Sequence, residues 1–437
     1  MIRILDRPWL LALGLVAVLS LAAVACEDED KDKTPTDGGT PSGEVTPGPG
    51  VTDTEIKLGT TNDLAGTGGT PYGVITTAML AFLAKVNEED GGICGRNVNL
   101  IAEDDQYASA QALEKTRKLV EQDQVLGIVS ALGTGAHLGA VDYLNDPNGD
   151  GDTADGIPDM LVSTGFSGWG DFENWPWTTG YIPDYLSDGR ILAEYINDNH
   201  AGENVGILYQ NDPFGEDYLK AIKDNLADAS LLVSEQSYEP GAPDVSGQVL
   251  NIQNDGAEVV VLASVPNQTA NARVSANTQD YQPTWLQSYV NAPTSVAALI
   301  GGGTDPEQMA DGFAVLQGTI GTNYLLDAIG DADDPAMVEH ARIMGEFSGP
   351  GVSTLSVYGQ SLAETLVDIL GRACDNLTRS GLQDAVESTQ GFSSTLMYPG
   401  IEVNLGPEDH YAIQALQPVQ IEADGTLTPL GGVLAAE

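Results

Sequence analysis

The sequence is short of basic residues. It holds 17 lysines and arginines against 64 aspartates and glutamates, a formal net charge of −47. Nucleic acid binding depends on cations that neutralise phosphates, so this balance excludes a nucleic-acid-binding protein. The acidic residues are spread along the chain instead of forming a tail, and a charge of this size keeps a protein soluble.

Motifs of catalysis are missing as well. The chain contains no G-x-S-x-G nucleophile elbow, no H-E-x-x-H zinc motif and no C-x-x-C pair. Its four histidines are scattered over positions 137, 200, 340 and 410. We therefore expect a binding protein and not an enzyme.

The N-terminus has the features of an export signal. Arg3 and Arg7 precede an uncharged apolar run over residues 9–25, and small residues stand directly before Cys26. The sequence LAAVAC resembles a bacterial lipobox, with Ala23 where leucine is commoner. We interpret residues 1–25 as a lipoprotein signal peptide and Cys26 as the lipidation site; the alternative is an uncleaved membrane anchor. Both interpretations place the folded part outside the cytoplasm, held at the cell membrane.

Residues 26–50 are rich in acids, Pro, Gly, Ser and Thr and have almost nothing apolar to bury. Such a composition predicts a disordered tether. The remainder of the chain exceeds what one hydrophobic core usually supports, so two lobes are predicted.

Strand and helix patterns alternate through the rest of the chain. A strand-like IKLGTTND, a glycine-rich turn, a long apolar helix and a second strand, VNLIAEDD, make one βαβ unit over residues 56–105. Further strands are predicted at 125–130 and 160–163, with helices at 108–121 and 137–144. A second series has strands at 205–209, 231–237, 259–263 and 284–287, alternating with helices at 188–197, 215–226, 246–254 and 268–277. Repeated βαβ units predict parallel sheets, and ligands bind outside the carboxyl ends of their strands, here near residues 64–72.

The order of these segments resembles the leucine/isoleucine/valine-binding family, the type I solute-binding proteins of ATP-driven (ABC) importers. The resemblance continues through SALGTGAH, STGFSGWGD, LYQNDPFGEDYL, VYGQSLAETLVDIL and YPGIEVN, and so covers nearly everything after Val51. It implies an α/β fold of two doubly wound parallel-sheet lobes joined by three hinge crossings, near residues 180–183, 317–323 and 393–399. The implied N-terminal lobe comprises residues 51–181 and 318–396, and the C-terminal lobe residues 182–317 and 397–437.

The resemblance also implies a ligand site between the lobes. Its expected residues are Tyr72, Thr134, Gly135, Gly165, Ser167, Trp169, Phe214 and Gln268. The Thr134 hydroxyl and the amides beside it would hold a ligand carboxylate, and the aromatic side chains would cover the ligand, although each could equally be ordinary core. The segment GTGAHLG also matches a dinucleotide loop superficially, but such a loop normally follows the first strand of its domain.

The second lobe departs from the family pattern. Amino-acid binders of the family present a glutamate to the ligand ammonium, whereas Gln268 lies near that position and residues 259–278 contain no acid. A buried ammonium without a carboxylate partner is costly. The expected ligand is therefore an aromatic or branched short-chain acid or a neutral amide, although Asp63, Asp184 or Asp212 could supply the charge for an amino acid.

These observations predict a monomeric, lipid-anchored solute-binding protein that captures a small carboxylate or amino-acid-like ligand and delivers it to the permease subunits of an ABC importer. Two alternatives are a ligand-sensing lipoprotein of the same fold and an exported nucleotide-dependent oxidoreductase.

The two other cysteines, Cys94 and Cys374, are predicted to form a disulfide, because an exported chain meets oxidising conditions. The alternative is two separate buried thiols.

An acidic insertion occupies residues 145–159. Asp146, Asn148, Asp150 and Asp152 alternate with the oxygen spacing of calcium loops, but Ile157 stands where the closing glutamate belongs. We predict a solvated acidic loop, with a Ca²⁺ site as the alternative, and no other cofactor.

The lipoprotein interpretation predicts the mass of the mature N-terminus. Purified from membranes, the chain should begin at a lipid-modified Cys26, and Cys26→Ser should abolish the modification. Mass spectrometry that finds Met1 retained would contradict it.

Overall fold

The computed structural model describes residues 46–66 and 71–436. Cys26, the predicted signal peptide and most of the predicted tether lie outside these ranges. Within them, none of the helices combines the length and the apolar character that a membrane crossing requires. The predicted tether is wrong at its end, because the Gly48 amide donates to the Leu377 carbonyl at 2.7 Å and the Gly50 carbonyl accepts from Lys57 at 2.9 Å.

The first sheet is parallel throughout the described residues. Its strands follow the order β2 (Asn97–Asp104), β1 (Glu55–Asn62), β3 (Ile128–Val129), β4 (Asp159–Val162) and β5 (Thr178–Gly180). Strand β1 pairs with β2 from Glu55 opposite Asn97 to Asn62 opposite Asp104. Every residue of β3 and β4 is buried, as expected for parallel strands covered on both faces.

The second sheet is parallel at one side and antiparallel at the other. Its parallel strands are β7 (Leu232–Tyr238), β6 (Val205–Gln210), β8 (Val259–Ala263), β9 (Thr284–Gln287) and β10 (Ile320–Asn323). Strand β11 (Ala415–Ile421) then runs antiparallel to β10 and pairs with β12 (Leu427–Pro429) and β13 (Leu434–Ala435). The α/β fold with parallel sheets that the sequence predicts is confirmed.

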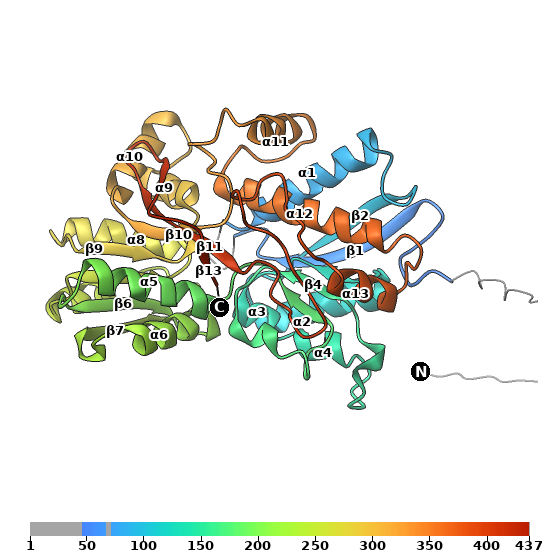
Figure 1. Ribbon diagram of the computed structural model, residues 1–437, viewed down its shortest axis with the longest axis horizontal. Coiled ribbons are helices and arrows are strands. Elements are labelled where there is room, and N and C mark those ends of the chain that lie inside the picture. Colours follow the sequence, from blue (N-terminus) through green and yellow to red (C-terminus); the bar gives the residue numbers. More distant parts are fainter. Residues whose placement is uncertain (1–45, 67–70, 437) are drawn as a thin grey trace, which may run out of the picture. The chain divides into compact units, whose positions relative to one another are not determined.

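Helices from distant parts of the chain accompany the first sheet. They are α1 (Gly73–Glu89), α2 (Ser109–Arg117), α3 (Thr134–His137), α4 (Val141–Asn145), α11 (Pro335–Glu346), α12 (Thr354–Arg372) and α13 (Arg379–Glu387). Helices α1 and α12 lie side by side (Figure 1). The contact needs glycine at position 359, since a Cβ there would lie 2.5 Å from the Ile75 carbonyl oxygen. The chain therefore returns to the first sheet after building most of the second.

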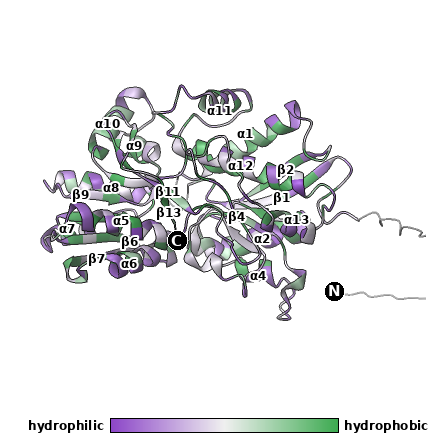
Figure 2. Ribbon diagram, viewed as in Figure 1, coloured by the Kyte–Doolittle hydropathy of each residue, from purple (hydrophilic) through white to green (hydrophobic). Residues whose placement is uncertain are grey.

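A second group of helices accompanies the strands β6 to β10. They are α5 (Tyr185–Asn199), α6 (Pro213–Asn225), α7 (Ser246–Asn254), α8 (Pro266–Thr278), α9 (Pro293–Gly301) and α10 (Pro306–Leu316). Helix α6 begins two residues before the predicted position: Asp212 caps the Gly215 amide and Pro213 occupies the first turn. Helices such as α1 and α11 carry both hydrophilic and hydrophobic residues, in keeping with one exposed and one buried face (Figure 2).

Some predicted elements differ from the structure. The helix predicted at 137–144 is two short helices, α3 and α4, interrupted where Gly139 passes the start of α2; a Cβ there would lie 2.4 Å from the Ser109 carbonyl oxygen. The helix predicted at 108–121 is α-helical only as far as the end of α2. The chain then continues as a π-helical turn, η1 (Lys118–Gln122). The segment expected to be a hinge at 317–323 contains β10. Short 3-10 turns complete the described residues: η2 (Thr153–Asp155), η3 (Ser167–Gly170), η4 (Ala229–Leu231) and η5 (Tyr289–Asn291).

A disulfide joins Cys94, which follows α1, to Cys374, which follows α12, as the sequence leads us to expect. The two cysteines are 280 residues apart in the sequence. The bond therefore covalently closes the contact between α1 and α12 that brings the chain back to the first sheet.

A buried carboxylate ties several elements of the second sheet together. Asp188 on α5 accepts hydrogen bonds from the Tyr218 hydroxyl on α6, from the Thr322 hydroxyl on β10 at 2.6 Å and from the Tyr289 amide on η5 at 3.4 Å. Burial raises the pKa of this carboxyl to about 6, in spite of these donors.

We predict that removing the disulfide lowers stability. A long loop closed by a disulfide loses entropy in the unfolded state, so the double variant Cys94→Ser, Cys374→Ser should lose about 2–4 kcal/mol of unfolding free energy in urea titrations. The oxidised wild type treated with dithiothreitol is the second measurement. Equal unfolding midpoints for all three samples would contradict the prediction.

Asp188 should make stability depend on pH. The folded state binds its proton more tightly than the unfolded state, so its contribution to stability falls as pH rises from about 4 to 6. Asp188→Asn removes this loss, and the stability of the variant relative to wild type should increase over that interval in urea titrations. Asp198→Asn, on the exposed face of the same helix, is the control and should follow wild type. A constant difference between Asp188→Asn and wild type would refute the assignment.

Candidate functional site

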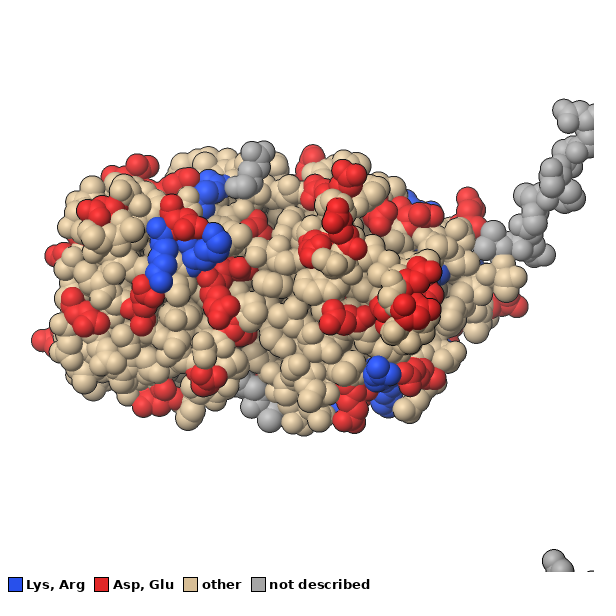
Figure 3. All heavy atoms as spheres, turned by 90° about the horizontal axis from the view of Figure 1, so that it is seen from below, with Lys and Arg blue, Asp and Glu red and all other residues tan. Residues whose placement is uncertain are grey.

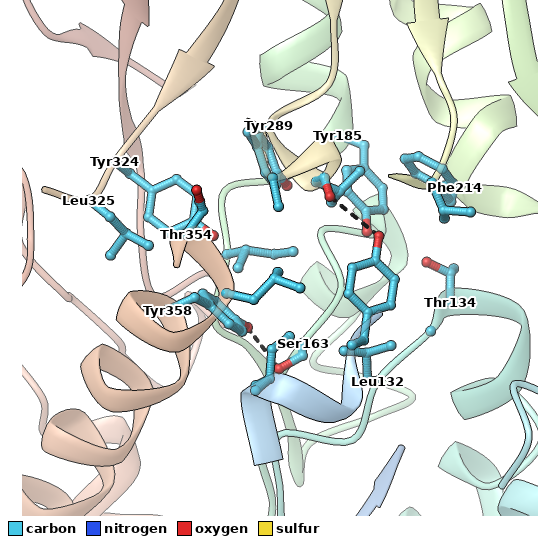
Figure 4. Close-up of a pocket in the computed structure, with 18 of the residues that line it drawn as sticks. Leu132, Thr134, Ser163, Tyr185, Phe214, Tyr289, Tyr324, Leu325, Thr354 and Tyr358 are labelled. Atoms are coloured by element: carbon cyan, nitrogen blue, oxygen red, sulfur yellow. Dashed lines mark hydrogen bonds between the residues drawn. The ribbon is translucent and has the colours of Figure 1, made fainter. Parts of the chain in front are cut away.

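A cavity lies beyond the carboxyl ends of strands from both sheets, and it encloses about 70 Å³ (Figure 4). From the first sheet and its helices it is lined by Tyr72, Ile75, Tyr107, Leu132, Gly133, Thr134, Ser163, Thr354, Leu355 and Tyr358. Ile182, where the chain crosses between the two sheets, lines the cavity as well. The lining residues from the second sheet and its connections are Tyr185, Phe214, Val265, Tyr289, Val290, Ala292, Asn323, Tyr324 and Leu325. Parallel sheets place their ligand sites at this edge, so the cavity is the candidate site.

Aromatic rings form one wall of this cavity. Tyr324 packs edge-on against Tyr289 with 5.5 Å between ring centroids, and Tyr289 stacks on Tyr185 at 6.1 Å. Tyr185 in turn meets Phe214 at 4.8 Å. These four residues, here called the aromatic wall, lie on one side of the cavity in Figure 4, with Leu132 and Ser163 on the other. The rings contact one another in sequence, which holds each of them in place.

Several hydroxyls of the residues that line the cavity already have protein partners. The Tyr358 hydroxyl donates to Ser163 Oγ at 2.7 Å, and Ser163 Oγ lies 2.7 Å from Ser130 Oγ. The Thr134 hydroxyl is 2.7 Å from that of Thr164. The Tyr72 hydroxyl donates to the Val290 carbonyl at 3.3 Å, a bond that crosses from the first sheet's side to the second's.

The lining contains no aspartate, glutamate, lysine, arginine or histidine among the described residues. Its tyrosines are protonated at physiological pH, since burial raises the pKa of Tyr185 to about 12 and raises the pKa of Tyr72, Tyr107, Tyr289, Tyr324 and Tyr358 further. The cavity is thus uncharged and bounded by aromatic rings, aliphatic side chains and a few neutral hydroxyls and amides.

Three of the residues predicted from the sequence, Tyr72, Thr134 and Phe214, line this cavity. Thr134 begins the short helix α3 after Gly133, which has φ +92°. A Cβ on Gly133 would lie 2.5 Å from the Tyr107 ring, so glycine here admits Tyr107 to the cavity wall. Whether the three residues bind a ligand stays a prediction.

Four other predicted residues are not on the cavity, and each has a structural task instead. The Gly165 carbonyl accepts the Tyr185 amide at 2.7 Å. Trp169 is fully buried and donates its Nε1 hydrogen to the Thr164 carbonyl at 3.1 Å. Gln268 donates to the Ala242 carbonyl at 2.6 Å, and its Oε1 has no hydrogen-bond partner among the described residues. Gly135 faces Asp212, whose Oδ2 would lie 3.4 Å from an added Cβ.

Ser167, also predicted to face the ligand, makes a different contact. Its amide and its hydroxyl donate to the two oxygens of Asp217 at 2.8 and 2.9 Å. Ser167 follows β4 of the first sheet, whereas Asp217 lies on α6 beside the second. Burial raises the pKa of Asp217 to about 6, against the lowering effect of these two bonds. The pair is a polar contact between the two halves of the fold, outside the cavity.

Sequence reasoning missed most of the aromatic wall. Tyr289 directly follows β9, so the rule that ligands bind at carboxyl ends could have found it. Tyr185 and Tyr324 follow chain crossings between the two sheets, and Tyr358 lies one turn into α12. No local pattern in the sequence signals that these residues converge.

The acidic insertion uses its oxygens to hold its own backbone. Asp146 accepts the amides of Gly149 and Gly151 at 2.8 and 2.9 Å, and Asp150 accepts that of Asp152 at 2.9 Å. No cluster of three or more His, Cys, Asp or Glu side chains suited to a metal occurs in the described part of the chain. The structure therefore lends the calcium interpretation of Asp146, Asn148, Asp150 and Asp152 no support.

Known proteins share this architecture. The family model for periplasmic binding proteins matches residues 55–426. The chain is 22% identical over 305 residues to Leu/Ile/Val-binding protein homolog 7 of Brucella abortus (strain 2308). The aligned region covers 64% of this chain and 68% of the relative.

Two solved structures extend the likeness. One is a branched chain amino acid ABC transporter protein from Thermus thermophilus with bound valine, with a TM-score of 0.73, 18% identity and coverage of 88% of this chain and 97% of the other. The second is a fatty acid ABC transporter substrate-binding protein from Thermomonospora curvata, with a TM-score of 0.71, 22% identity and coverage of 90% and 96%. At these identities the structures establish a shared fold, that of the type I periplasmic binding proteins. The resemblance to the leucine/isoleucine/valine-binding family is confirmed, and with most of its length matched, this chain belongs to the periplasmic binding protein family.

Proposed function

We propose that this protein is an extracytoplasmic solute-binding protein, tethered to the membrane through Cys26, which captures a small organic ligand in the cavity and delivers it to an ABC importer. The observation that carries the proposal is the cavity itself, because its walls come from the carboxyl ends of both sheets. A ligand there contacts both halves of the protein at once, which is what a protein that closes around its cargo requires.

Closure requires two lobes, and we propose that they follow the implied chain path. Residues 51–181 with 324–396 would form one lobe, and residues 182–323 with 397–437 the other. The boundary implied at 317 moves to 323 because β10 pairs with β9 and β11 in the second sheet. Three crossings between them would allow the lobes to move by bending a few loop residues. The similar proteins from Thermus thermophilus and Thermomonospora curvata are named as ABC transporter proteins, which supports the transport role.

Polar contacts at three places would favour the closed arrangement. They join Ser167 to Asp217, Tyr72 to the Val290 carbonyl, and Thr294 to Thr354, where the two hydroxyls lie 3.1 Å apart and the Thr354 amide donates to Thr294 at 3.0 Å. Each contact pairs one lobe with the other. None involves a ligand, so they would add to ligand affinity by stabilising the state that encloses it.

Transport can be tested with the permease and ATPase subunits encoded by the host. In proteoliposomes, the liganded protein should stimulate ATP hydrolysis more than the ligand-free protein. If no permease responds while the purified protein still binds a solute, the import role is wrong and the binding role survives.

The contact between Ser167 and Asp217 should contribute to ligand affinity. Asp217→Ala removes two hydrogen bonds of the closed state, each worth about 0.5–1.5 kcal/mol, so the dissociation constant should rise by about tenfold. Isothermal titration with the ligand that gives the largest thermal shift in a solute screen measures this change. Asp224→Ala, on the exposed end of the same helix, is the control and should bind as wild type does. An Asp217→Ala variant with unchanged affinity would show that the contact has no part in closure.

A further inference from the structure

We propose that the cavity is selective for a small uncharged organic molecule with an apolar body and a single carbonyl, amide or hydroxyl group, in preference to a carboxylate or an amino acid. The inference rests on the proposed function, since it takes the cavity to be the ligand site. It narrows the ligand class that the sequence leaves open between acids, amino acids and neutral amides.

The first argument is the absence of charge from the cavity wall. No lining residue among those described has an ionisable side chain other than tyrosine, and the tyrosine hydroxyls stay protonated. The undescribed residues 67–70 are Thr-Gly-Gly-Thr, which add no charge. A zwitterion brought into this cavity would leave both its ammonium and its carboxylate without an ionic partner, and such burial is strongly unfavourable.

The second argument concerns the acids that could have supplied a partner for an ammonium. Asp184 caps the Ser187 amide at 2.9 Å, and Asp212 accepts from Gln210 Nε2 at 2.8 Å. Asp188 is held by the Tyr218 and Thr322 hydroxyls. None of these carboxylates lines the cavity, and neither does Asp63. The sequence-based option of an alternative acid for an amino-acid ligand therefore has no counterpart at the cavity wall.

The same acids act against a carboxylate ligand. After the larger effect of burial, Asp212 contributes to raising the pKa of Tyr107 and Asp188 to raising that of Tyr289, so both carboxylates disfavour a further negative charge beside these rings. No cation on the lining offsets it. On the face shown in Figure 3, acidic side chains are widely distributed and basic ones are few, in keeping with a net charge of −47. An anion would enter a desolvated site near buried carboxylates and gain only neutral donors.

The third argument is the match between the cavity and a neutral molecule. The free space of about 70 Å³ is small, which suits a ligand of few heavy atoms. The aromatic wall and the aliphatic side chains of Ile75, Leu132 and Leu355 offer apolar contact. The hydroxyls of Ser163, Thr134 and Tyr358 already form hydrogen bonds with protein partners. A ligand with one carbonyl requires few of these bonds to change, whereas a carboxylate requires several donors.

Matched probes test the charge preference. Calorimetric titration of the purified full chain at pH 7 would use isobutyramide, isobutyrate, isobutylammonium and valine, followed by acetamide against acetate and benzamide against benzoate. Because each amide and its carboxylate share one shape, their affinities differ through charge. At least one amide should bind, and about tenfold or more tightly than its carboxylate, with valine and isobutylammonium weaker still.

The outcomes separate the inference from the proposed function. Equal or tighter binding of valine, isobutylammonium or any carboxylate overturns the inference and leaves a solute-binding protein. If no probe of any charge binds, both are overturned.

A charge-introducing variant gives a second, independent readout. Leu355→Lys places a cation on the cavity wall and should increase affinity for isobutyrate about tenfold while weakening isobutyramide. Leu250→Lys makes the same change on the exposed face of α7, where the leucine is 46% exposed, and should alter neither affinity. Circular dichroism of both variants checks folding. A Leu355→Lys protein that folds and gains no affinity for isobutyrate would show that charge in the cavity does not set the ligand class.

Discussion

Parallel pairing is the constraint on which the rest of this structure depends. Strand β1 pairs in parallel with both β2 and β3, and β6 with both β7 and β8. Neighbouring parallel strands cannot be joined by a tight turn, so each connection crosses the sheet, usually through a helix. All the carboxyl ends of a sheet then share one edge, with their loops gathered there. The cavity lies at that edge of both sheets, which is why residues as distant as Tyr72 and Tyr358 line it together.

The return of the chain to its first sheet is a second consequence. Helix α12 packs against α1 through Gly359, and the disulfide between Cys94 and Cys374 holds the ends of the same two helices. Tyr358 stands beside Gly359 and reaches Ser163 at 2.7 Å on the cavity wall. The packing of α1 against α12 thus positions one of the rings that line the site. The disulfide, which lies beyond the ends of these two helices, links them covalently.

The contrast between surface and cavity bears on the function. An excess of 47 negative charges occurs in a chain whose candidate site has no ionisable side chain apart from tyrosine among its described lining residues. Most of the described charged side chains are at least partly exposed, where water and salt screen them, whereas an unpaired charge in the cavity would be costly. Acids near the site, such as Asp188 and Asp212, are buried or half-buried, and their carboxylates accept hydrogen bonds from neighbouring donors. Recognition in the proposed site would therefore depend on shape, apolar contact and neutral hydrogen bonds.

Much of the fold could be predicted from the sequence, because periodicity is local. The strand at 259–263 and the helix at 246–254 coincide with β8 and α7, since a run of valines and a segment with apolar residues at helical spacing leave little choice. Helix α9, helix α10 and strand β10 were missed, because Pro and Gly in that region give turn signals that the tertiary contacts override. The break between α3 and α4 depends on where Gly139 meets Ser109, a contact outside any local window.

By itself the sequence determined the βαβ order, the acidic character of the chain and the absence of a glutamate near Gln268. It also placed Tyr72, Thr134 and Phe214 at the starts of helices that follow buried strands. Only the tertiary structure decided which side chains meet. It turned Gln268, Trp169 and Ser167 away from the cavity and brought Tyr185, Tyr289, Tyr324 and Tyr358 to it. The physical reason is that side-chain direction at the end of a strand depends on the elements packed against it, and those elements come from both sheets and from both ends of the chain.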